Sequence, residues 1–199
     1  MSSRVNIVRA HAADAEKITA VLSTGFYADP VCRWFFPDDA ERERLQPLFF
    51  GPIVDMTLKG GEIYTTDDRT AAALWLPVNV AEHADSPSMQ EFYEPVLGSF
   101  YAKRIGAYAE RSSANHPTHA DHQYLTFIAV QPDRFGRGLG TALLRDRLDA
   151  LDERGVPAYL EASNPDSRRL YERLGYRQLG RTIDMPDGPS LWPMWRDPS

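Results

Sequence analysis

Near the N-terminus, the spacing of apolar residues changes from two to three or four. The alternation over residues 5–9 predicts a short strand. Beyond Asp14, which can cap a helix, apolar residues share one helical face as far as Phe26. This helix should end before Pro30, because a residue that precedes proline disfavours helical backbone. An aromatic run at 34–36 leads into a second predicted helix, whose apolar residues include Leu45, Leu48, Phe49, Ile53 and Val54.

The middle of the chain predicts a hairpin followed by a helical region. The glycine pair at 60–61 separates the second helix from strands at 62–66 and 70–76, which three polar residues join. Residues 78–120 contain helical patches that are rich in phenylalanine and tyrosine. These aromatic residues, like those at 34–36, are expected in the core or as walls of a ligand pocket.

The last third of the chain predicts the order strand, helix, strand, helix. The strands are residues 124–130 and 158–161, the helices are 139–154 and 165–174, and further strands are expected at 177–181 and 191–195. A mixed sheet with helices on both faces follows, which is an α/β (α+β) fold.

Composition narrows the class of protein. The 199 residues are 43% hydrophobic and 25% charged, as in an ordinary globular domain. The single cysteine, Cys32, excludes a disulfide framework and is expected to be a buried small apolar residue. No signal-like segment opens the sequence and no run of 18 apolar residues occurs, so we expect a cytoplasmic protein without a membrane partner.

The charge distribution argues against a nucleic-acid partner but allows one local anion site. The formal net charge is −6, which does not suit a general nucleic-acid binder. Residues 134–181 nevertheless hold ten arginines against seven acidic residues. These arginines either attract a small anion or simply lie on solvated helix faces.

Residues 130–141 carry the clearest chemical signal. They leave a strand, place glycines at 136, 138 and 140, and open a helix. Glycines allow a tight turn and a close approach to the backbone, and the free amides of a first helical turn bind anions. Arg137 and Arg134 can add positive charge. A ligand that bears phosphate is therefore predicted.

Two other phosphate-binding motifs fit poorly. A P-loop needs a lysine, and the chain has none after residue 103. A dinucleotide fingerprint that starts at Gly138 would need glycine where Leu143 stands. It would also begin two-thirds of the way along the chain, which leaves no room for a doubly wound sheet. An NAD-dependent oxidoreductase stays a minor alternative.

The residues Val130-x-Pro132 and 136–140 resemble the acyl-CoA signature of the GNAT superfamily of N-acetyltransferases. Residues 160–164 and 170–176 agree with it. The resemblance implies a mostly antiparallel central sheet and one acyl-CoA N-acyltransferase domain over 1–199, with 78–120 on the acceptor side. Within the superfamily, residues 154–161 and 185–189 are most similar to the puromycin N-acetyltransferases. Phe135 departs from the family pattern, which has Gln or Arg there.

The resemblance also implies where acetyl-CoA binds. The edge of the strand at Ile128, Ala129 and Val130 would pair with the pantetheine arm. Asn164 would hydrogen-bond that arm or cap the helix that Pro165 opens. Ser167 shares a helical face with Tyr171, and both are expected beside the cofactor. The pyrophosphate would be held by the amides of Phe135, Gly136, Arg137, Gly138, Leu139, Gly140 and Thr141.

Tyr171 resembles the family's general acid, because a neutral phenol can protonate a departing thiolate; otherwise it is a core tyrosine. Glu161 is the first candidate for the base, or it orients a loop, and Asp29, Tyr124 and His122 are further candidates. Backbone amides near residues 128–130 would stabilise the oxyanion.

The implied activity is an acetyl-CoA-dependent transfer of an acetyl group to a primary amine of a small molecule, puromycin-like or other, in a ternary complex. The alternative is a non-catalytic acyl-CoA-binding sensor. No metal cofactor is expected, although His116, His119 and His122 are spaced by three as metal ligands can be. The apolar tail at 191–195 would allow a homodimer.

Overall fold

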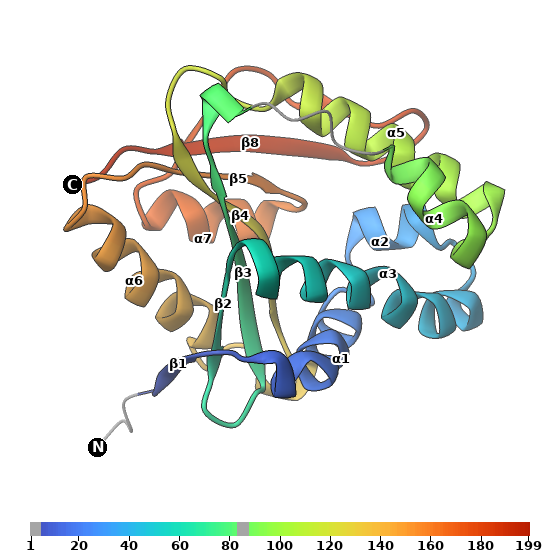
Figure 1. Ribbon diagram of the computed structural model, residues 1–199, viewed down its shortest axis with the longest axis horizontal. Helices are drawn as coiled ribbons and strands as arrows, with labels where there is room; N and C mark the ends of the chain where they lie inside the picture. The colour runs from blue at the N-terminus through green and yellow to red at the C-terminus, as the bar shows by residue number, and fades with distance from the viewer. Residues whose placement is uncertain (1–4, 83–87) are drawn as a thin grey trace.

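The computed structural model describes residues 5–82 and 88–199, and a single open sheet runs through its centre (Figure 1). The strand order is β1-β2-β3-β4-β5-β8-β6, with β7 paired to β8. Only β4 and β5 pair in parallel, and the other described pairs are antiparallel. The strands are β1 (Ile7–Arg9), β2 (Glu62–Thr66), β3 (Ala71–Val78), β4 (His122–Val130), β5 (Ala158–Ala162), β6 (Arg177–Gln178), β7 (Ile183–Asp184) and β8 (Ser190–Arg196).

Helices cover both faces of the sheet, as predicted (Figure 1). One face carries α6 and α7, and the other carries α1 to α5. Short 3-10 turns occur at Ala12–Asp14, Val80–Glu82 and Pro132–Arg134. The helices are α1 (Ala15–Gly25), α2 (Pro30–Phe35), α3 (Asp39–Gly60), α4 (Met89–Leu97), α5 (Ser99–Asn115), α6 (Leu139–Asp152) and α7 (Pro165–Arg173). The predicted helical segment 78–120 corresponds to α4 and α5, although its residues 83–87 lie outside the described residues.

The side chains of β5 alternate between the two cores. Ala158, Leu160 and Ala162 are buried in the core beneath α6 and α7. Successive residues of a strand point to opposite faces, so Tyr159 and Glu161 face the side where α5 lies. The hydrogen bond from Ser112 of α5 to Glu161 confirms this direction.

A bulge makes β4 part from β5. Trp75 pairs with Leu125 and Leu74 pairs with Phe127, which leaves Thr126 as the extra residue in β4. A bulge bends its strand. The parallel ladder to β5 contains only residues 123–124 with 158–159. Within the described chain, residues 125–130 of β4 therefore have no strand partner on that edge.

Two apolar features of the sequence take positions that depend on tertiary contacts. Leu48 is 41% exposed, whereas the polar residues Arg42, Gln46 and Thr57 belong to the buried stripe of α3 on the other side of the helix. The apolar tail at 191–195 is not an exposed face, since β8 lies between β5 and β6 and both Leu191 and Met194 are buried. The tail is therefore part of the sheet interior, and the homodimer stays a prediction.

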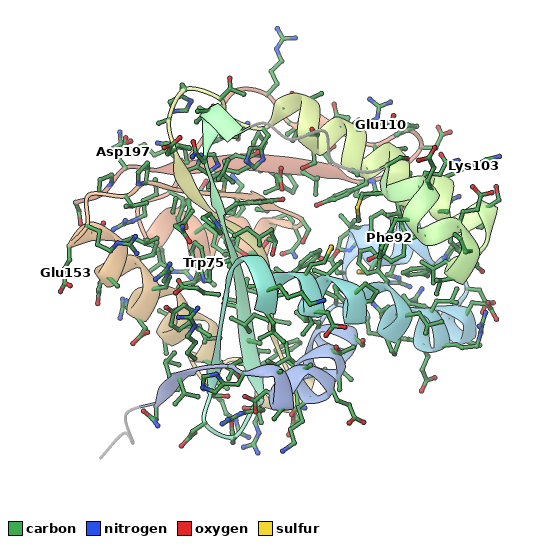
Figure 2. The ribbon with its side chains drawn as sticks, viewed as in Figure 1. Trp75, Phe92, Lys103, Glu110, Glu153 and Asp197 are labelled. Carbon is green, nitrogen blue, oxygen red and sulfur yellow. The ribbon has the colours of Figure 1, made fainter. Side chains whose placement is uncertain are left out.

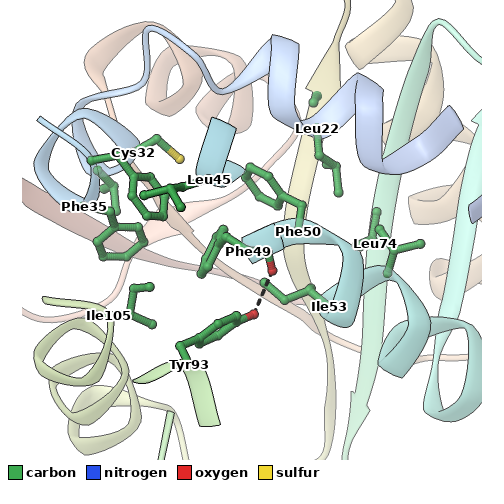
Figure 3. Close-up of a cluster of buried hydrophobic side chains, with 14 of the residues drawn as sticks. Leu22, Cys32, Phe35, Leu45, Phe49, Phe50, Ile53, Leu74, Tyr93 and Ile105 are labelled. Carbon is green, nitrogen blue, oxygen red and sulfur yellow. Dashed lines mark hydrogen bonds between the residues drawn. The ribbon is translucent and has the colours of Figure 1, made fainter. Parts of the chain in front are cut away.

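The aromatic core between α1, α3 and β4 should dominate stability (Figure 3). Phe50 is fully buried, and its ring centroid lies 4.9, 5.4 and 5.6 Å from those of Phe49, Phe127 and Phe26. Phe50→Ala should lower the free energy of unfolding by about 3–5 kcal/mol through lost burial and the cavity left behind. Urea unfolding measures this change.

Phe92 on α4, labelled in Figure 2, provides the matched control. It is 42% exposed. Phe92→Ala removes the same atoms and should change the free energy of unfolding by under about 1 kcal/mol, because little cavity forms. Equal losses in the two variants would contradict the assignment of this cluster as the main core.

A salt bridge joins the end of α6 to the end of β8. Both Arg196 guanidinium nitrogens, Nη1 and Nη2, donate to Asp152 at 2.6 Å, and the backbone N–H of Ser199 adds a bond of 3.0 Å. Arg196 thereby holds the pKa of Asp152 well below its usual range. The ion pair contributes fully to the free energy of unfolding above about 3.9, the pKa of the carboxyl group in the unfolded chain. This contribution is lost as the pH falls toward the lower pKa that Asp152 has in the folded protein.

Asp152→Asn should therefore lower the free energy of unfolding by about 1–2 kcal/mol at pH 7, a value that allows for solvent screening. The difference from the unsubstituted protein should shrink as the pH falls below about 4. Urea titrations at pH 7 and pH 3 measure both values. A difference that is the same at both pH values would show that the ion pair contributes nothing.

Candidate active site

A cavity of about 580 Å³ opens where β4 and β5 diverge. Its walls come from four parts of the fold. These are residues 125–130 of β4, the end of β5 with residues 163–164, the turn from α1 into α2 at 25–32, and the α7 side chains 166–171. Phe35 of α2 and Tyr108 of α5 close it from the side. Both belong to the aromatic residues for which the sequence allowed either a place in the core or a place in a pocket wall.

The glycine turn after β4 has the geometry of an anion cradle. Gly136 and Gly138 have φ of 75° and 78°, a left-handed conformation that favours glycine. Gly138 precedes α6 as its N-cap and provides no side-chain cap, so the first-turn amides of α6 stay available for a ligand. The turn is open, because a Cβ at either glycine would meet no atom within 4 Å.

The structure brings most of the predicted cofactor residues to one cavity and leaves the rest in the turn. The cavity is lined by Ile128, Ala129, Val130, Phe135, Gly140, Asn164, Ser167 and Tyr171. The adjoining turn and first helical residues hold Gly136, Arg137, Gly138, Leu139 and Thr141, which do not line it. The Phe135 ring is 59% exposed at the edge of the lining.

Asn164 caps α7. Its Oδ1 accepts the backbone N–H of Ser167 at 2.9 Å, and its Nδ2 donates to Ser163 Oγ at 3.3 Å. Pro165 follows at the first helical position. The capping alternative is thus realised, and the same side chain still lines the cavity.

Tyr171 presents a neutral phenol to the cavity. The side chain is 6% exposed and lines the cavity, and its hydroxyl forms no hydrogen bond to any described residue. Burial, with the negative charge of Asp29 as a second cause, raises the pKa of Tyr171 well above that of a free phenol. The group is therefore protonated at neutral pH and has a proton to donate.

Glu161 is a carboxylate fixed by three hydroxyl groups. Ser112 Oγ donates to its Oε1 at 2.6 Å, Tyr159 OH donates to Oε1 at 3.1 Å, and Tyr124 OH donates to Oε2. Burial raises the pKa of Glu161, and the three donors lower it by a smaller amount. A carboxylate with a raised pKa that faces a cavity is suited to accept a proton near neutral pH.

Asp29 supplies a second carboxylate. Its Oδ1 caps α2 by accepting the backbone N–H of Val31 at 2.9 Å, and its Oδ2 accepts Ser163 Oγ at 2.5 Å. Burial raises the pKa of Asp29. Sequence reasoning missed the parts of Ser163 and Ser112. No local signal marks either serine, because Ser112 meets Glu161 and Ser163 meets Asp29 across distant parts of the chain.

The histidines pair with each other. His116 Nε2 lies 3.0 Å from His122 Nε2, His122 Nδ1 lies 2.9 Å from the Ala120 carbonyl, and the His119 ring packs on Trp195. In the part of the chain that the structure describes, no group of His, Cys, Asp and Glu side chains is arranged to hold a metal. None of the helices within these residues is long and apolar enough to cross a membrane.

Two sequence relatives cover much of the chain. An uncharacterised N-acetyltransferase of Schizosaccharomyces pombe is 25% identical over 187 residues, which are 84% of this chain and 72% of that protein. A mycothiol acetyltransferase of Thermomonospora curvata is 30% identical over 149 residues, which are 66% of this chain. The chain spans about half of the latter protein, with 49% of its length covered.

Solved structures share the fold along nearly the whole chain. A Corynebacterium glutamicum protein described as histone acetyltransferase HPA2 and related acetyltransferase has a TM-score of 0.73 at 26% identity, with 99% of this chain and 98% of that chain covered. Arylalkylamine N-acetyltransferase 2 of Aedes aegypti has the same TM-score at 14% identity, with 99% and 100% covered, which shows a common fold.

The sequence model of the Acetyltransferase (GNAT) family matches residues 64–176. That range runs from β2 to the end of α7 and contains the bulged strand, the glycine turn, Glu161 and Tyr171. The match covers more than half of the chain, and it includes β4, β5 and α7, whereas the wall from the α1–α2 turn lies before it. This protein therefore belongs to the acetyltransferase (GNAT) family.

Proposed function

We propose that this chain is an acetyl-CoA-dependent N-acetyltransferase that acetylates a primary amine of a small molecule by direct transfer in a ternary complex. One observation carries the proposal. A single cavity joins the unpaired edge of β4 to a free phenol and two carboxylates, which come from α7, β5 and the turn before α2. Acetyl-CoA would supply an activated thioester, and the chain would supply the binding edge, the acid and the base.

The residues present suit a coenzyme A molecule. Residues 125–130 of β4 offer an unpaired strand edge to an extended amide-bearing arm. The open glycine turn offers amides and a helix N-terminus to a pyrophosphate. Arg137 is exposed beside these amides. Phe135 offers no side-chain contact, because a phenyl ring cannot pair with phosphate, and its backbone N–H donates to the Pro132 carbonyl at 3.3 Å.

The proposed roles are those of the groups that accept and donate protons during the transfer. Glu161 takes the proton from the incoming ammonium, so that the nitrogen can form its bond to the acetyl carbon. Backbone N–H groups near residues 128–130 stabilise negative charge on the carbonyl oxygen. Tyr171 donates its proton to the sulfur as the carbon–sulfur bond breaks. The nitrogen loses its second proton as the amide forms, and that proton returns the Tyr171 phenolate to its neutral form through solvent. The proton on Glu161 leaves to solvent, so one proton is released in each turnover.

The acceptor we would test first is puromycin, because residues 154–161 and 185–189 are similar to the puromycin-acetylating members of the family. An arylalkylamine is a second choice, since Phe35 and Tyr108 line the acceptor side of the cavity. A cytoplasmic location and a homodimer also stay predictions.

The first experiment is thermal unfolding with acetyl-CoA, with CoA and with NAD. A ligand at one hundred times its dissociation constant should stabilise the protein by about 2.7 kcal/mol. We expect a rise with both CoA species and none with NAD, followed by CoA release when the correct amine is added. Binding without release for any amine would favour the acyl-CoA-binding sensor. No rise with either CoA species would contradict both functions.

A further inference from the structure

The cavity contains acidic side chains and no basic ones. Of the described residues that line it, Asp29, Glu161 and Asp166 carry carboxylates, and none is a lysine, arginine or histidine. Asp166 is exposed and pairs with Arg169. Asp29 and Glu161 take part in no ion pair with any described residue.

Both unpaired carboxylates are held in place by neutral donors. Glu161 accepts hydrogen bonds from three hydroxyl groups. Asp29 accepts two backbone N–H groups and one hydroxyl group. A desolvated carboxylate that lacks a counter-charge is costly. The described residues place no cation on the walls, so a bound cationic ligand would supply the counter-charge that these two carboxylates lack.

The two carboxylates form separate anchor points. Asp29 bonds to Ser163, which lies two residues after Glu161. Ser163 follows directly after β5, which ends at Ala162, so Asp29 is bound to the segment that leaves the strand while Glu161 lies within it. Tyr108 is close enough to both carboxylates to respond to their charges. Burial raises the pKa of Tyr108, and the negative charges of Glu161 and Asp29 raise it further. The Tyr108 ring packs against Phe35 at 5.4 Å, and both rings line the cavity.

We propose that the acceptor is a dicationic amine, in which Glu161 faces the amine that reacts and Asp29 binds a second cationic nitrogen across an apolar stretch of the same molecule. The inference rests on the proposed function and names its substrate class. A monoamine satisfies one carboxylate and leaves the other without counter-charge. A diamine satisfies both, and Phe35 and Tyr108 contact the carbon chain between the two nitrogens.

The second cation also favours catalysis by Tyr171. Asp29 and Tyr171 line the same cavity, and the negative charge of Asp29 is one cause of the raised Tyr171 pKa. An ammonium on Asp29 offsets that charge, which makes the phenol a better proton donor. A diamine should therefore show a higher kcat than a monoamine of equal length, in addition to a lower KM.

The test measures binding without requiring turnover. Isothermal titration in the presence of CoA compares diamines of three to six methylenes with monoamines and amino alcohols of equal length. We expect the best diamine to bind at least tenfold more tightly than its amino alcohol. Asp29→Asn should abolish this preference, and it keeps the α2 cap because asparagine also caps helices. Glu110→Gln, which removes an exposed carboxylate of α5 labelled in Figure 2, should preserve the preference.

The amino alcohol comparison needs no variant, so a poorly folded Asp29→Asn protein leaves the inference testable. Equal binding of diamines and amino alcohols would overturn it. Persistence of the diamine preference in folded Asp29→Asn protein would overturn the role of Asp29. Acetyl-CoA binding with acetylation of monoamines alone would refute the dicationic acceptor and leave the acetyltransferase standing. Absence of acetyl-CoA binding would refute the acetyltransferase itself.

Discussion

Tyr171→Phe should lower kcat by about 10²–10⁴-fold, the usual range for removal of a general acid, and should leave the affinity for acetyl-CoA almost unchanged. The substitution removes one hydroxyl group, and that hydroxyl makes no hydrogen bond to a described residue. The ring, which packs against Tyr176 at 5.9 Å between centroids, is retained. The loss should therefore appear in the chemical step and in neither binding nor folding.

Tyr176→Phe is the control for this prediction. Tyr176 is 2% exposed and lies beside Tyr171, but it does not line the cavity. Its hydroxyl is buried and has no hydrogen-bond partner among the described residues, so removing that group should not weaken folding. Steady-state kinetics with titration of acetyl-CoA measures both variants. A loss of under tenfold in Tyr171→Phe, or equal losses in both variants, would assign Tyr171 to the core.

The sequence predicts the glycine turn and the strand that ends at the cavity better than it predicts the opposite wall. The glycines at 136, 138 and 140 lie in one short stretch, and the backbone conformation they require is local. The alternation that sends Leu160 to the core and Glu161 to the cavity is also local. A pattern within ten residues is sufficient in both cases, and the structure confirms the fold that it predicts.

The parts that could not be predicted depend on contacts between distant segments. The bulge at Thr126 is defined by its register against β3, which lies about fifty residues earlier. Ser112 meets Glu161 across 49 residues, and Ser163 meets Asp29 across 134. The burial of Arg42 in α3 has the same origin. Arg42 is buried because its Nη1 donates to the Phe36 carbonyl at 2.7 Å, a partner that no helical periodicity reveals.

Glu161→Gln should lower kcat/KM at pH 7 by about 10²–10⁴-fold, the range for a general base, and should change the shape of the pH profile. In the unsubstituted protein, Glu161 accepts the proton of a bound ammonium. The rate should then rise with pH through the Glu161 pKa, which burial raises, and stay level up to the pKa of the amine. The glutamine variant has no base at this position and must bind the neutral amine from solution. The fraction of neutral amine rises tenfold per pH unit below the pKa of the amine, so kcat/KM of the variant should rise by the same factor where that of the unsubstituted protein is constant.

The two profiles should therefore converge as the pH approaches the pKa of the amine, near about 10 for an alkylamine such as lysine. Glu172→Gln, which removes an exposed carboxylate paired with Arg168 on α7, should keep the level region. Convergence separates loss of a base from loss of folding, because a misfolded variant would be slow at every pH. A level profile in Glu161→Gln would assign proton removal to another group, with Asp29 the next candidate, because its carboxylate lines the same cavity and burial raises its pKa.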